Sequence, residues 1–298
     1  MELYLGVDAG GTHTRARLVD GDGKVLGVGE AGPANTRVGL DAALAEVEQA
    51  WQEAARGAGL SRSSLGDVAA ALGIAGLNRR GVLSGLQARA FPFRSIAFAS
   101  DAAIAAWGAH DGGDGGIVIV GTGSIGFARI GEDIVTVGGY GFPVSDEGSG
   151  ADLGLRALRR SLWARDGRIP RSPMTLKLLE QFDHSPGEIV DWTGSATPAD
   201  YAAFAPMIME YATLGDPVAE PIVQEAALRI DRLVRALLDR GAPACCLMGG
   251  LAERMRAWLA AGVRERLREP MGDALNGAIL LARHRATGGE GAPARTPA

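Results

Sequence analysis

Apolar residues along this chain fall into short runs typical of strands and longer amphipathic segments typical of helices. Three short apolar runs, near residues 3–8, 14–19 and 24–28, come first, and an alanine-rich segment with helical spacing follows over 40–56. The next segments are predicted as a strand, a helix, a strand and a helix, at residues 68–74, 80–90, 95–99 and 101–109. The order of three strands followed by helix and strand alternation predicts one α/β domain.

The same order begins again after a glycine-rich loop at residues 110–115. Strands are predicted at 116–120, 125–130 and 133–138, before a long helical region over 152–240, a strand at 244–248 and helices that end near residue 285. We interpret this as a structural duplication, with one domain over 1–112 and a second over 113–298, whose last helix can pack back on the first domain. Three tryptophans of the helical region are assigned to the core: Trp163, Trp192 and Trp258.

The amino-acid composition limits the kinds of molecule that this protein can be expected to bind. The 298 residues carry a net charge of −5, and the arginines are scattered among acids without a basic stripe, which argues against nucleic acid. Cys245 and Cys246 are adjacent in an apolar run, so on a strand they point to opposite faces, and we expect both in the core. No stretch approaches the roughly 20 apolar residues of a membrane span. We expect a cytoplasmic protein with a small-molecule ligand.

Two glycine-rich loops follow apolar strands. The first is Asp8-Ala9-Gly10-Gly11-Thr12. Its amides can face a phosphate, and a carboxylate beside that anion calls for a hard cation such as Mg²⁺. The same residues are also ordinary turn formers. The second loop, Gly121-Thr122-Gly123-Ser124, follows a predicted buried strand. Two such loops can hold one polyphosphate.

The second loop also fits the dinucleotide pattern G-x-G-x-x-G, so a nicotinamide-dependent oxidoreductase is an alternative. That pattern requires a helix directly after the glycines. Residues 127–137 instead predict a hairpin around Gly131. The oxidoreductase is therefore less favoured.

Four short motifs, taken in order, resemble the phosphate, catalytic, second phosphate and adenosine motifs of the sugar kinase, Hsp70 and actin superfamily. They are Asp8–Thr12, Ser100-Asp101-Ala102-Ala103, Gly121–Ser124 and Met248-Gly249-Gly250. Within that superfamily the chain resembles the BadF/BadG/BcrA/BcrD type, and specifically the N-acetylglucosamine and glucosamine kinases. That likeness rests on residues 138–142, 145–150 and 272–278, and it extends from residue 3 to about 286.

The resemblance implies an α/β fold of two ribonuclease-H-like (actin-like ATPase) domains. Each domain would hold a mixed five-stranded sheet, with ATP and sugar bound in a cleft between the domains that closes to exclude water. The implied activity is ATP-dependent phosphorylation of the 6-hydroxyl of N-acetylglucosamine or glucosamine, with Mg²⁺. Relatives are commonly homodimers.

Roles for single residues are also implied by the resemblance. Asp101 would be the general base, although an acid at a helix start is also a good N-cap. Asp8 would hold Mg²⁺ directly or through water. The nucleotide would be bound by Gly10, Gly11, Thr12, Thr14, Gly121, Thr122, Gly123, Ser124, Gly249 and Gly250, the last two near adenine.

The sugar would be bound by Asn35, Gly139, Tyr140 and Asp146, together with Asp101. Relatives often have tryptophan at the position of Tyr140, and the animal enzymes have histidine at that of Phe142. These departures leave the contact to an N-acetyl group open. The sequence therefore does not decide between glucosamine and N-acetylglucosamine.

Two further classes were weighed. Some members of this type are ATPases that energise a partner reductase through an iron–sulfur cluster shared across a dimer, but such a cluster needs several cysteines and this chain has two, side by side. Sugar-responsive repressors with a kinase fold carry an N-terminal DNA-binding helix-turn-helix, whereas this sequence starts on its first predicted strand. The amino-sugar kinase is the favoured interpretation.

Overall fold

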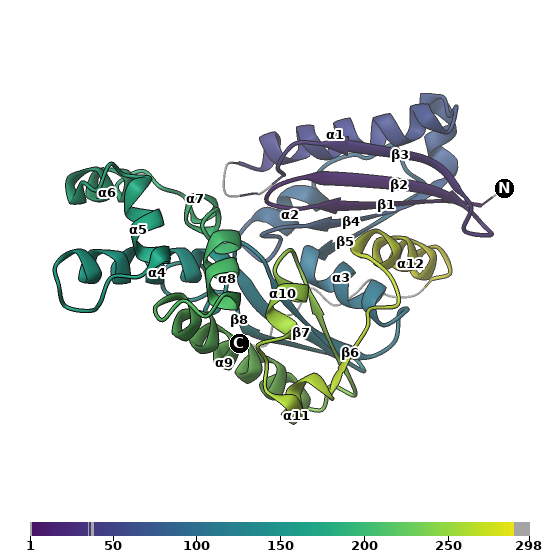
Figure 1. Cartoon of the computed structure of the whole chain (residues 1–298). Coiled ribbons are helices and arrows are strands. Elements are labelled where there is room, and N and C mark those ends of the chain that lie inside the picture. The colour runs from purple at the N-terminus through teal and green to yellow at the C-terminus, as the bar shows by residue number, and fades with distance from the viewer. Residues whose placement is uncertain (1, 35, 37–38, 289–298) are drawn as a thin grey trace. The chain divides into compact units, whose positions relative to one another are not determined.

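The structure is a computed structural model that describes residues 2–34, 36 and 39–288, and it divides into two compact units (Figure 1). The first unit contains the chain up to Ile117, the segment Phe127–Val135 and the chain from Glu269 onward. The second unit contains Val118–Gly126 and Thr136–Arg268. The boundary expected after residue 112 falls near the end of the longest segment of the first unit. In the described part of the chain, no helix is long and apolar enough to cross a membrane.

The sheet of the first unit has five strands in the order β3-β2-β1-β4-β5. Their bounds are β1 Leu3–Ala9, β2 Thr14–Asp20, β3 Val25–Ala31, β4 Val68–Ile74 and β5 Ser95–Ser100. The pairs β1–β2 and β2–β3 are antiparallel, and the pairs β1–β4 and β4–β5 are parallel. β4 is buried at every position, as its continuous apolar run predicts for a central parallel strand.

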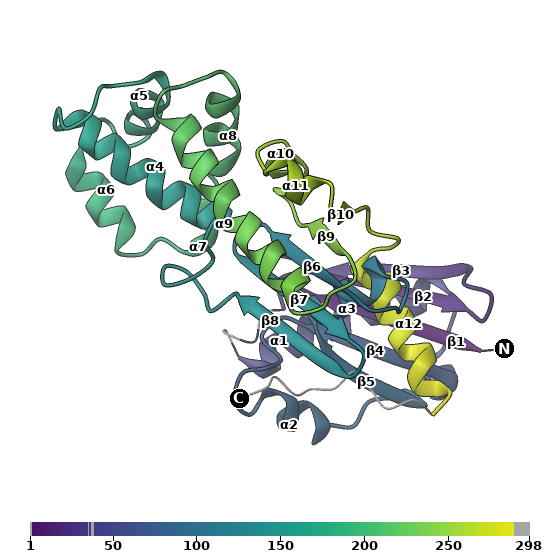
Figure 2. The same ribbon diagram turned by 90° about the horizontal axis from the view of Figure 1, so that it is seen from below.

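Helices cover both sides of this sheet, with α1 (Leu40–Gly57) on one side and α3 (Asp101–Ala109) and α12 (Ala274–Ala286) on the other (Figures 1 and 2). Glycines allow the close contacts. A side chain at Gly27 of β3 would collide with the Ala54 carbonyl of α1, and one at Gly277 of α12 would collide with the Ile104 carbonyl of α3. The unit is completed by the 3₁₀ helix η2 (Arg62–Asp67) and by α2 (Val82–Gln87), which is shorter than the predicted 80–90.

A second five-stranded sheet has the order β10-β9-β6-β7-β8. Its strands are β6 Gly115–Val120, β7 Ser124–Ile130, β8 Asp133–Gly138, β9 Cys245–Met248 and β10 Leu267–Arg268. The two sheets confirm the predicted α/β class and the repeat of the strand order. Both cysteines of β9 are buried, as predicted, and burial raises the pKa of the Cys245 thiol to about 12.

The second unit also contains most of the helices. They are α4 Gly150–Arg165, α5 Pro173–Glu180, α6 Pro186–Thr193, α7 Pro198–Ala202, α8 Ala205–Thr213, α9 Ala219–Asp239, α10 Ala252–Arg256 and α11 Ala261–Arg264. Hydroxyl side chains cap α4 to α7, and proline at the first turn of α5, α6 and α7 fixes where each begins. α9 buries the stripe that its apolar spacing predicts, including Ile222, Ala226, Ile230 and Leu237.

The three tryptophans assigned to the core are only partly buried, which corrects that prediction. Trp163 stacks under the Arg168 guanidinium, 4.7 Å from the ring centre. Trp192 packs among other aromatic rings, and Trp258 lines a surface pocket. Helical spacing alone does not distinguish a core ring from a ring that forms one wall of a pocket.

Candidate active site

The first glycine loop forms the turn between β1 and β2. The Gly10 amide donates to the His13 carbonyl at 3.0 Å, and the Gly10 carbonyl accepts from the Ala34 amide at 3.0 Å. Thr14 is fully buried, and its hydroxyl donates to the Gly32 carbonyl at 2.8 Å. The Thr14 hydroxyl therefore joins the hairpin to the segment that follows β3, and its contact with a phosphate stays a prediction.

A pocket of about 420 Å³ lies beside this turn. It is lined by Asp8, Gly10, Gly11, Thr12, His13, Arg15 and Glu30. Residues 11–13 are exposed, so the amides and the Thr12 hydroxyl lie at the surface. Glycine amides, a hydroxyl and a guanidinium form a donor set that suits phosphate oxygens.

Asp8 has a partner that the sequence analysis missed. Its Oδ2 atom accepts a hydrogen bond from Arg15 Nη2 at 2.7 Å, and this bond raises the pKa of the Arg15 guanidinium above its usual value. The two residues lie directly opposite each other in the antiparallel register of β1 and β2. The sequence could have predicted this pair, because residues at equal distances from a hairpin turn face each other across the two strands.

Asp8 alone does not make a metal site. Among the described residues, no three His, Cys, Asp or Glu side chains cluster so that they could hold an ion. Mg²⁺ usually keeps several waters and is bound through one or two carboxylates plus the phosphates of its nucleotide. One carboxylate beside a phosphate-binding turn fits that mode of binding, and it does not fit a metal held by protein side chains alone.

Asp101 is the first residue of α3, directly after β5. The N-cap of this helix is Ser100, whose Oγ accepts from the Ala103 amide at 3.1 Å. The Asp101 carboxylate accepts from the adjacent Ala102 amide at 2.9 Å. The capping role that competed with the catalytic one is therefore filled by Ser100.

Burial raises the pKa of the Asp101 carboxyl above its usual value. The bond from the Ala102 amide opposes this effect, and the negative charge of Asp8 adds to it. An ionised carboxylate in such surroundings accepts a proton more readily than one in water. Perturbed acids of this kind are typical of functional sites.

The second glycine loop lies between β6 and β7. The Gly121 and Thr122 carbonyls accept from the Gly150 and Ala151 amides at 2.8 and 3.2 Å, which ties the loop to the start of α4. Ser124 is buried, and its hydroxyl donates to the Glu147 carbonyl at 2.8 Å. Thr122 is exposed, so this loop presents its backbone and the Thr122 side chain to the surface.

The Gly249-Gly250 turn lies against the end of β6. Gly249 has a φ of 100°, and a side chain there would collide with the Val120 carbonyl oxygen. The same oxygen accepts from the Leu251 amide at 3.0 Å. A Cβ atom at Gly121 would lie 4.0 Å from the Gly250 nitrogen. The structure thus brings the second phosphate motif and the adenosine motif side by side.

The proposed sugar residues are placed only in part. Asn35 lies outside the described residues. Asp146, with a φ of 67°, holds its carboxylate over the second glycine loop, since a Cβ atom at Gly123 would be 2.7 Å from Asp146 Oδ2. Gly139 has a φ of 73° and little room for a side chain beside Ile125, and the Tyr140 side chain is 82% exposed.

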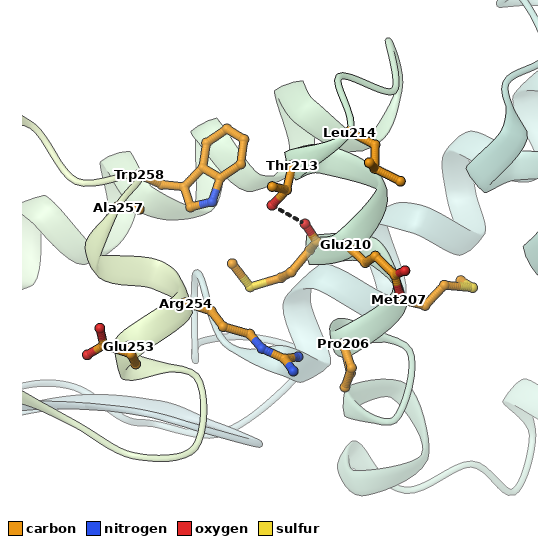
Figure 3. A pocket seen from close by; sticks show the side chains of 10 residues that line it. Pro206, Met207, Glu210, Thr213, Leu214, Glu253, Arg254, Ala257 and Trp258 are labelled. Atoms are coloured by element: carbon orange, nitrogen blue, oxygen red, sulfur yellow. Dashed lines mark hydrogen bonds between the residues drawn. The ribbon is translucent and has the colours of Figure 1, made fainter.

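A further pocket, of about 560 Å³, lies between α8 and α10 (Figure 3). Its apolar walls come largely from methionine, leucine and tryptophan side chains, and its polar groups include one arginine. The lining residues are Pro206, Met207, Met209, Glu210, Thr213, Leu214, Glu253, Arg254, Ala257 and Trp258. One side of the pocket comes from α10, which begins two residues after Gly250.

The sequence pattern of the BadF/BadG/BcrA/BcrD ATPase family matches residues 5–282. The chain belongs to this family. Family membership confirms the resemblance inferred from the ordered motifs.

Similar proteins include two kinases of amino sugars and one solved structure. The chain is 38% identical over 282 residues to the glucosamine kinase GspK of Vibrio cholerae, a match that covers 95% of this chain and 96% of that protein. It is 29% identical to the N-acetylmuramic acid/N-acetylglucosamine kinase of Clostridium acetobutylicum, over 80% of each chain. A crystal structure from Chromobacterium violaceum, described as a candidate N-acetylglucosamine kinase, has a TM-score of 0.88 and 35% identity and covers 95% of this chain and 99% of its own.

The oxidoreductase alternative fails on the same loop that raised it. The residues after Gly123 form the strand β7, where the dinucleotide fingerprint requires a helix. β7 and β8 are neighbours in the second sheet, as the predicted hairpin requires.

We predict that Asp101→Asn raises the free energy of unfolding at neutral pH. Folding raises the pKa of this carboxyl, so its ionised form destabilises the fold above the folded pKa, and that cost vanishes below the unfolded value of about 3.9. Urea unfolding at a series of pH values measures the gain, which should shrink as the pH falls. The control Ser100→Ala should lose about 1 kcal/mol at every pH, because it removes a cap. An Asp101→Asn protein that is less stable than the wild type at pH 7 would contradict the assignment.

Proposed function

We propose that this protein transfers the γ-phosphoryl group of ATP to the 6-hydroxyl of an amino sugar, glucosamine or N-acetylglucosamine. The observation that carries the proposal is the Asp101 carboxylate, which is not needed as a cap and is made more basic by burial. Support comes from a glucosamine kinase that is 38% identical over nearly the whole chain.

In the proposed reaction, the sugar 6-oxygen attacks the γ-phosphorus as Asp101 accepts the hydroxyl proton. The bond between the 6-oxygen and phosphorus forms, the bond to the β,γ-bridging oxygen breaks, and ADP leaves. Little other covalent chemistry is required of the protein. Its remaining task is to position the reactants and to stabilise charge on the phosphates.

Both glycine loops would serve the phosphates. The first loop offers the Gly11 and Thr12 amides and the Thr12 hydroxyl, and the second offers the Thr122 and Gly123 amides and the Thr122 hydroxyl. The Gly10 and Gly121 amides are already bonded to the His13 and Gly123 carbonyls inside their loops. Mg²⁺, held by Asp8 directly or through water, would offset the negative charge that accumulates on the phosphate oxygens. Arg15 holds the Asp8 carboxylate at the edge of the first loop.

We place the adenine ring in the pocket between α8 and α10. A flat, largely apolar base suits walls made of Trp258 and methionines, and the Arg254 guanidinium can stack on it. One wall of the pocket is formed by α10, which begins just after Gly250, where the resemblance puts the adenosine. For the sugar, Asp146 and Gly139 stay the candidates, with Tyr140 and Asn35 as further predictions. A homodimer and a cytoplasmic location stay predictions of the resemblance.

The test of the proposed function is ADP release with ATP and Mg²⁺, with and without each sugar. We expect release to depend on glucosamine or N-acetylglucosamine, to be much slower with glucose, and to yield a 6-phosphate identified by phosphorus–proton NMR correlation. The better of the two amino sugars identifies the substrate. ADP release that no hexosamine changes would remove the kinase and favour an ATPase that energises a partner.

We predict that Asp101→Asn lowers turnover by about a hundredfold or more while ATP and sugar still bind, because general-base assistance is lost and the side-chain shape is kept. Steady-state kinetics measure the turnover, and calorimetric titration measures the binding of each ligand. Near-normal turnover in this variant would remove Asp101 as the base, and Asp146→Asn would then be tested.

The pocket between α8 and α10 gives a separate prediction. Trp258→Ala should raise the KM for ATP about tenfold, since stacking on an aromatic ring contributes on the order of 1 kcal/mol or more, and it should leave the KM for the sugar unchanged. Trp163→Ala is the matched control, because it removes another partly buried tryptophan of the same unit that does not line this pocket. An equal effect of both variants would show that the pocket does not bind the base.

A further inference from the structure

A chain of polar contacts leads from the second glycine loop to α9. Its first part is the segment Ser145–Gly150, called here the acidic loop. Three hydrogen bonds join this segment and the first turn of α4 to the glycine loop: Gly150 N–H to the Gly121 carbonyl, Ala151 N–H to the Thr122 carbonyl, and the Ser124 hydroxyl to the Glu147 carbonyl. The acidic loop also carries Asp146, whose carboxylate lies over Gly123. The position of the acidic loop therefore fixes both the second glycine loop and the Asp146 carboxylate.

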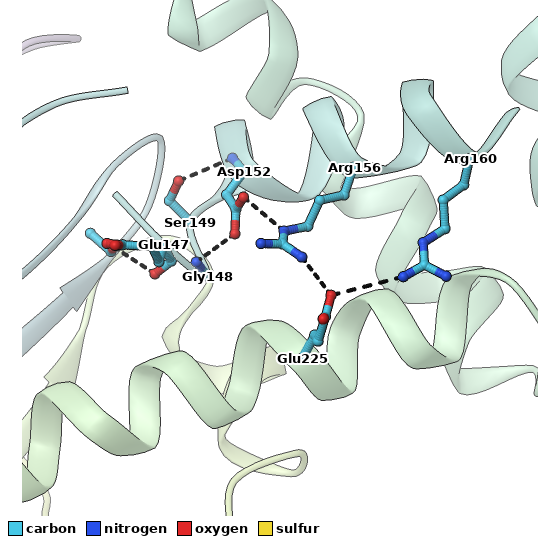
Figure 4. Close-up of polar contacts among 8 residues, drawn as sticks. Glu147, Gly148, Ser149, Asp152, Arg156, Arg160 and Glu225 are labelled. Atoms are coloured by element: carbon cyan, nitrogen blue, oxygen red, sulfur yellow. Dashed lines mark hydrogen bonds and ion pairs between the residues drawn. The ribbon is translucent and has the colours of Figure 1, made fainter. Parts of the chain in front are cut away.

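The acidic loop is itself held by the side chain of Asp152 in the first turn of α4 (Figure 4). One carboxylate oxygen, Oδ2, accepts from the Gly148 amide at 2.9 Å. Gly148 has a φ of 78°, and a Cβ atom there would lie 2.7 Å from the Ala226 carbonyl oxygen of α9. Only glycine allows this backbone conformation and this close approach to α9, and the hydrogen bond from its amide to Asp152 holds the loop at that point.

Arg156 lies one turn further along α4 and fixes Asp152. Its Nε atom donates to Asp152 Oδ1 at 2.8 Å, and its Nη1 atom donates to Glu225 Oε2 of α9 at 2.5 Å (Figure 4). The Asp152 and Arg156 side chains are only 13% and 20% exposed. A carboxylate with so little contact to water is held firmly by a guanidinium that contacts it through a charge-assisted hydrogen bond.

We infer that Arg156 is a positioning residue for the proposed reaction. By holding Asp152 against Gly148 and tying α4 to α9, it sets the place of the acidic loop, and with it the Asp146 carboxylate and the second glycine loop. This inference rests on the proposed function for its kinetic consequence, and on the contacts alone for its structural one. Arg156 touches neither substrate nor nucleotide in this scheme.

Arg160 provides a matched control. It lies four residues further along the same helix and reaches the same Glu225 carboxylate, but at 3.9 Å and with no contact to Asp152 among those found in the described residues. Replacing either arginine by methionine removes one positive charge and keeps most of the aliphatic side chain. Only Arg156→Met removes the hydrogen bond that holds Asp152, the residue that accepts from the Gly148 amide.

The kinetic test compares these two variants with the wild type. Arg156→Met should lower kcat at least tenfold and raise the KM for both ATP and the amino sugar, because one loop positions groups for both and small displacements of catalytic geometry are costly. Arg160→Met should change each constant less than twofold. Arg156→Lys should recover only part of the loss, since one ammonium does not reproduce the two-sided fork that joins Asp152 and Glu225. Unchanged kcat and KM in folded Arg156→Met would overturn the inference.

A structural readout separates this inference from the proposed function. Hydrogen exchange of the amides in residues 145–151 should be at least tenfold faster in Arg156→Met and unchanged in Arg160→Met, whether or not any sugar is phosphorylated. If the wild-type protein shows no sugar-dependent turnover but the exchange result holds, the proposed function fails and the positioning role stands. If Arg156→Met does not fold, the same measurement is made on Arg156→Lys. Exchange that is equal to wild type in the folded variant would refute the role of Arg156.

Discussion

The carbonyl oxygen of Val120, at the end of β6, is the contact around which the second unit's site is assembled. It accepts a hydrogen bond from the Leu251 amide and leaves no space for a side chain at Gly249. The backbone of the turn after β9 therefore lies in direct contact with the backbone at the end of β6. Only glycine permits that approach, and the approach is what brings the second glycine loop and the Gly249-Gly250 turn to one place.

In the first unit, two aspartates of the candidate site differ in their electrostatic surroundings. Asp8 and Asp101 are acids close enough to influence each other, yet their surroundings differ. Asp8 forms an ion pair with Arg15, whereas the Asp101 carboxylate is buried and accepts a hydrogen bond from the Ala102 amide. This difference in surroundings is consistent with the two tasks proposed for them, binding a cation for Asp8 and accepting a proton for Asp101.

The sequence predicted the strands, the repeat of their order and the places of the glycine loops, because apolar periodicity and glycine placement are local signals. Asp101 was recognised as a possible cap from the sequence, but the geometry assigns the cap to Ser100. Thr14 and Ser124 belong to matching motifs, yet their hydroxyls are used inside the fold. A motif gives the residue type at a position and does not give the direction of its side chain.

Contacts between segments far apart in the sequence could not be predicted from the sequence. Trp258 became part of a pocket only because α8 and α10 lie opposite each other, and Arg156 gained its importance from Glu225, 69 residues away. Neither residue stands out in its own segment. Arg156 sits on an amphipathic helix where an arginine is ordinarily a solvated surface residue.

The arrangement around Gly148 shows why such a residue can matter for chemistry that it does not touch. A loop with left-handed residues at Asp146 and Gly148 has little regular hydrogen bonding of its own, so its shape depends on groups outside it. Asp152 supplies one such group, and Arg156 keeps that carboxylate in place by joining it to α9. The loop is thus held through Asp152 and Arg156, whose side chains are largely shielded from water.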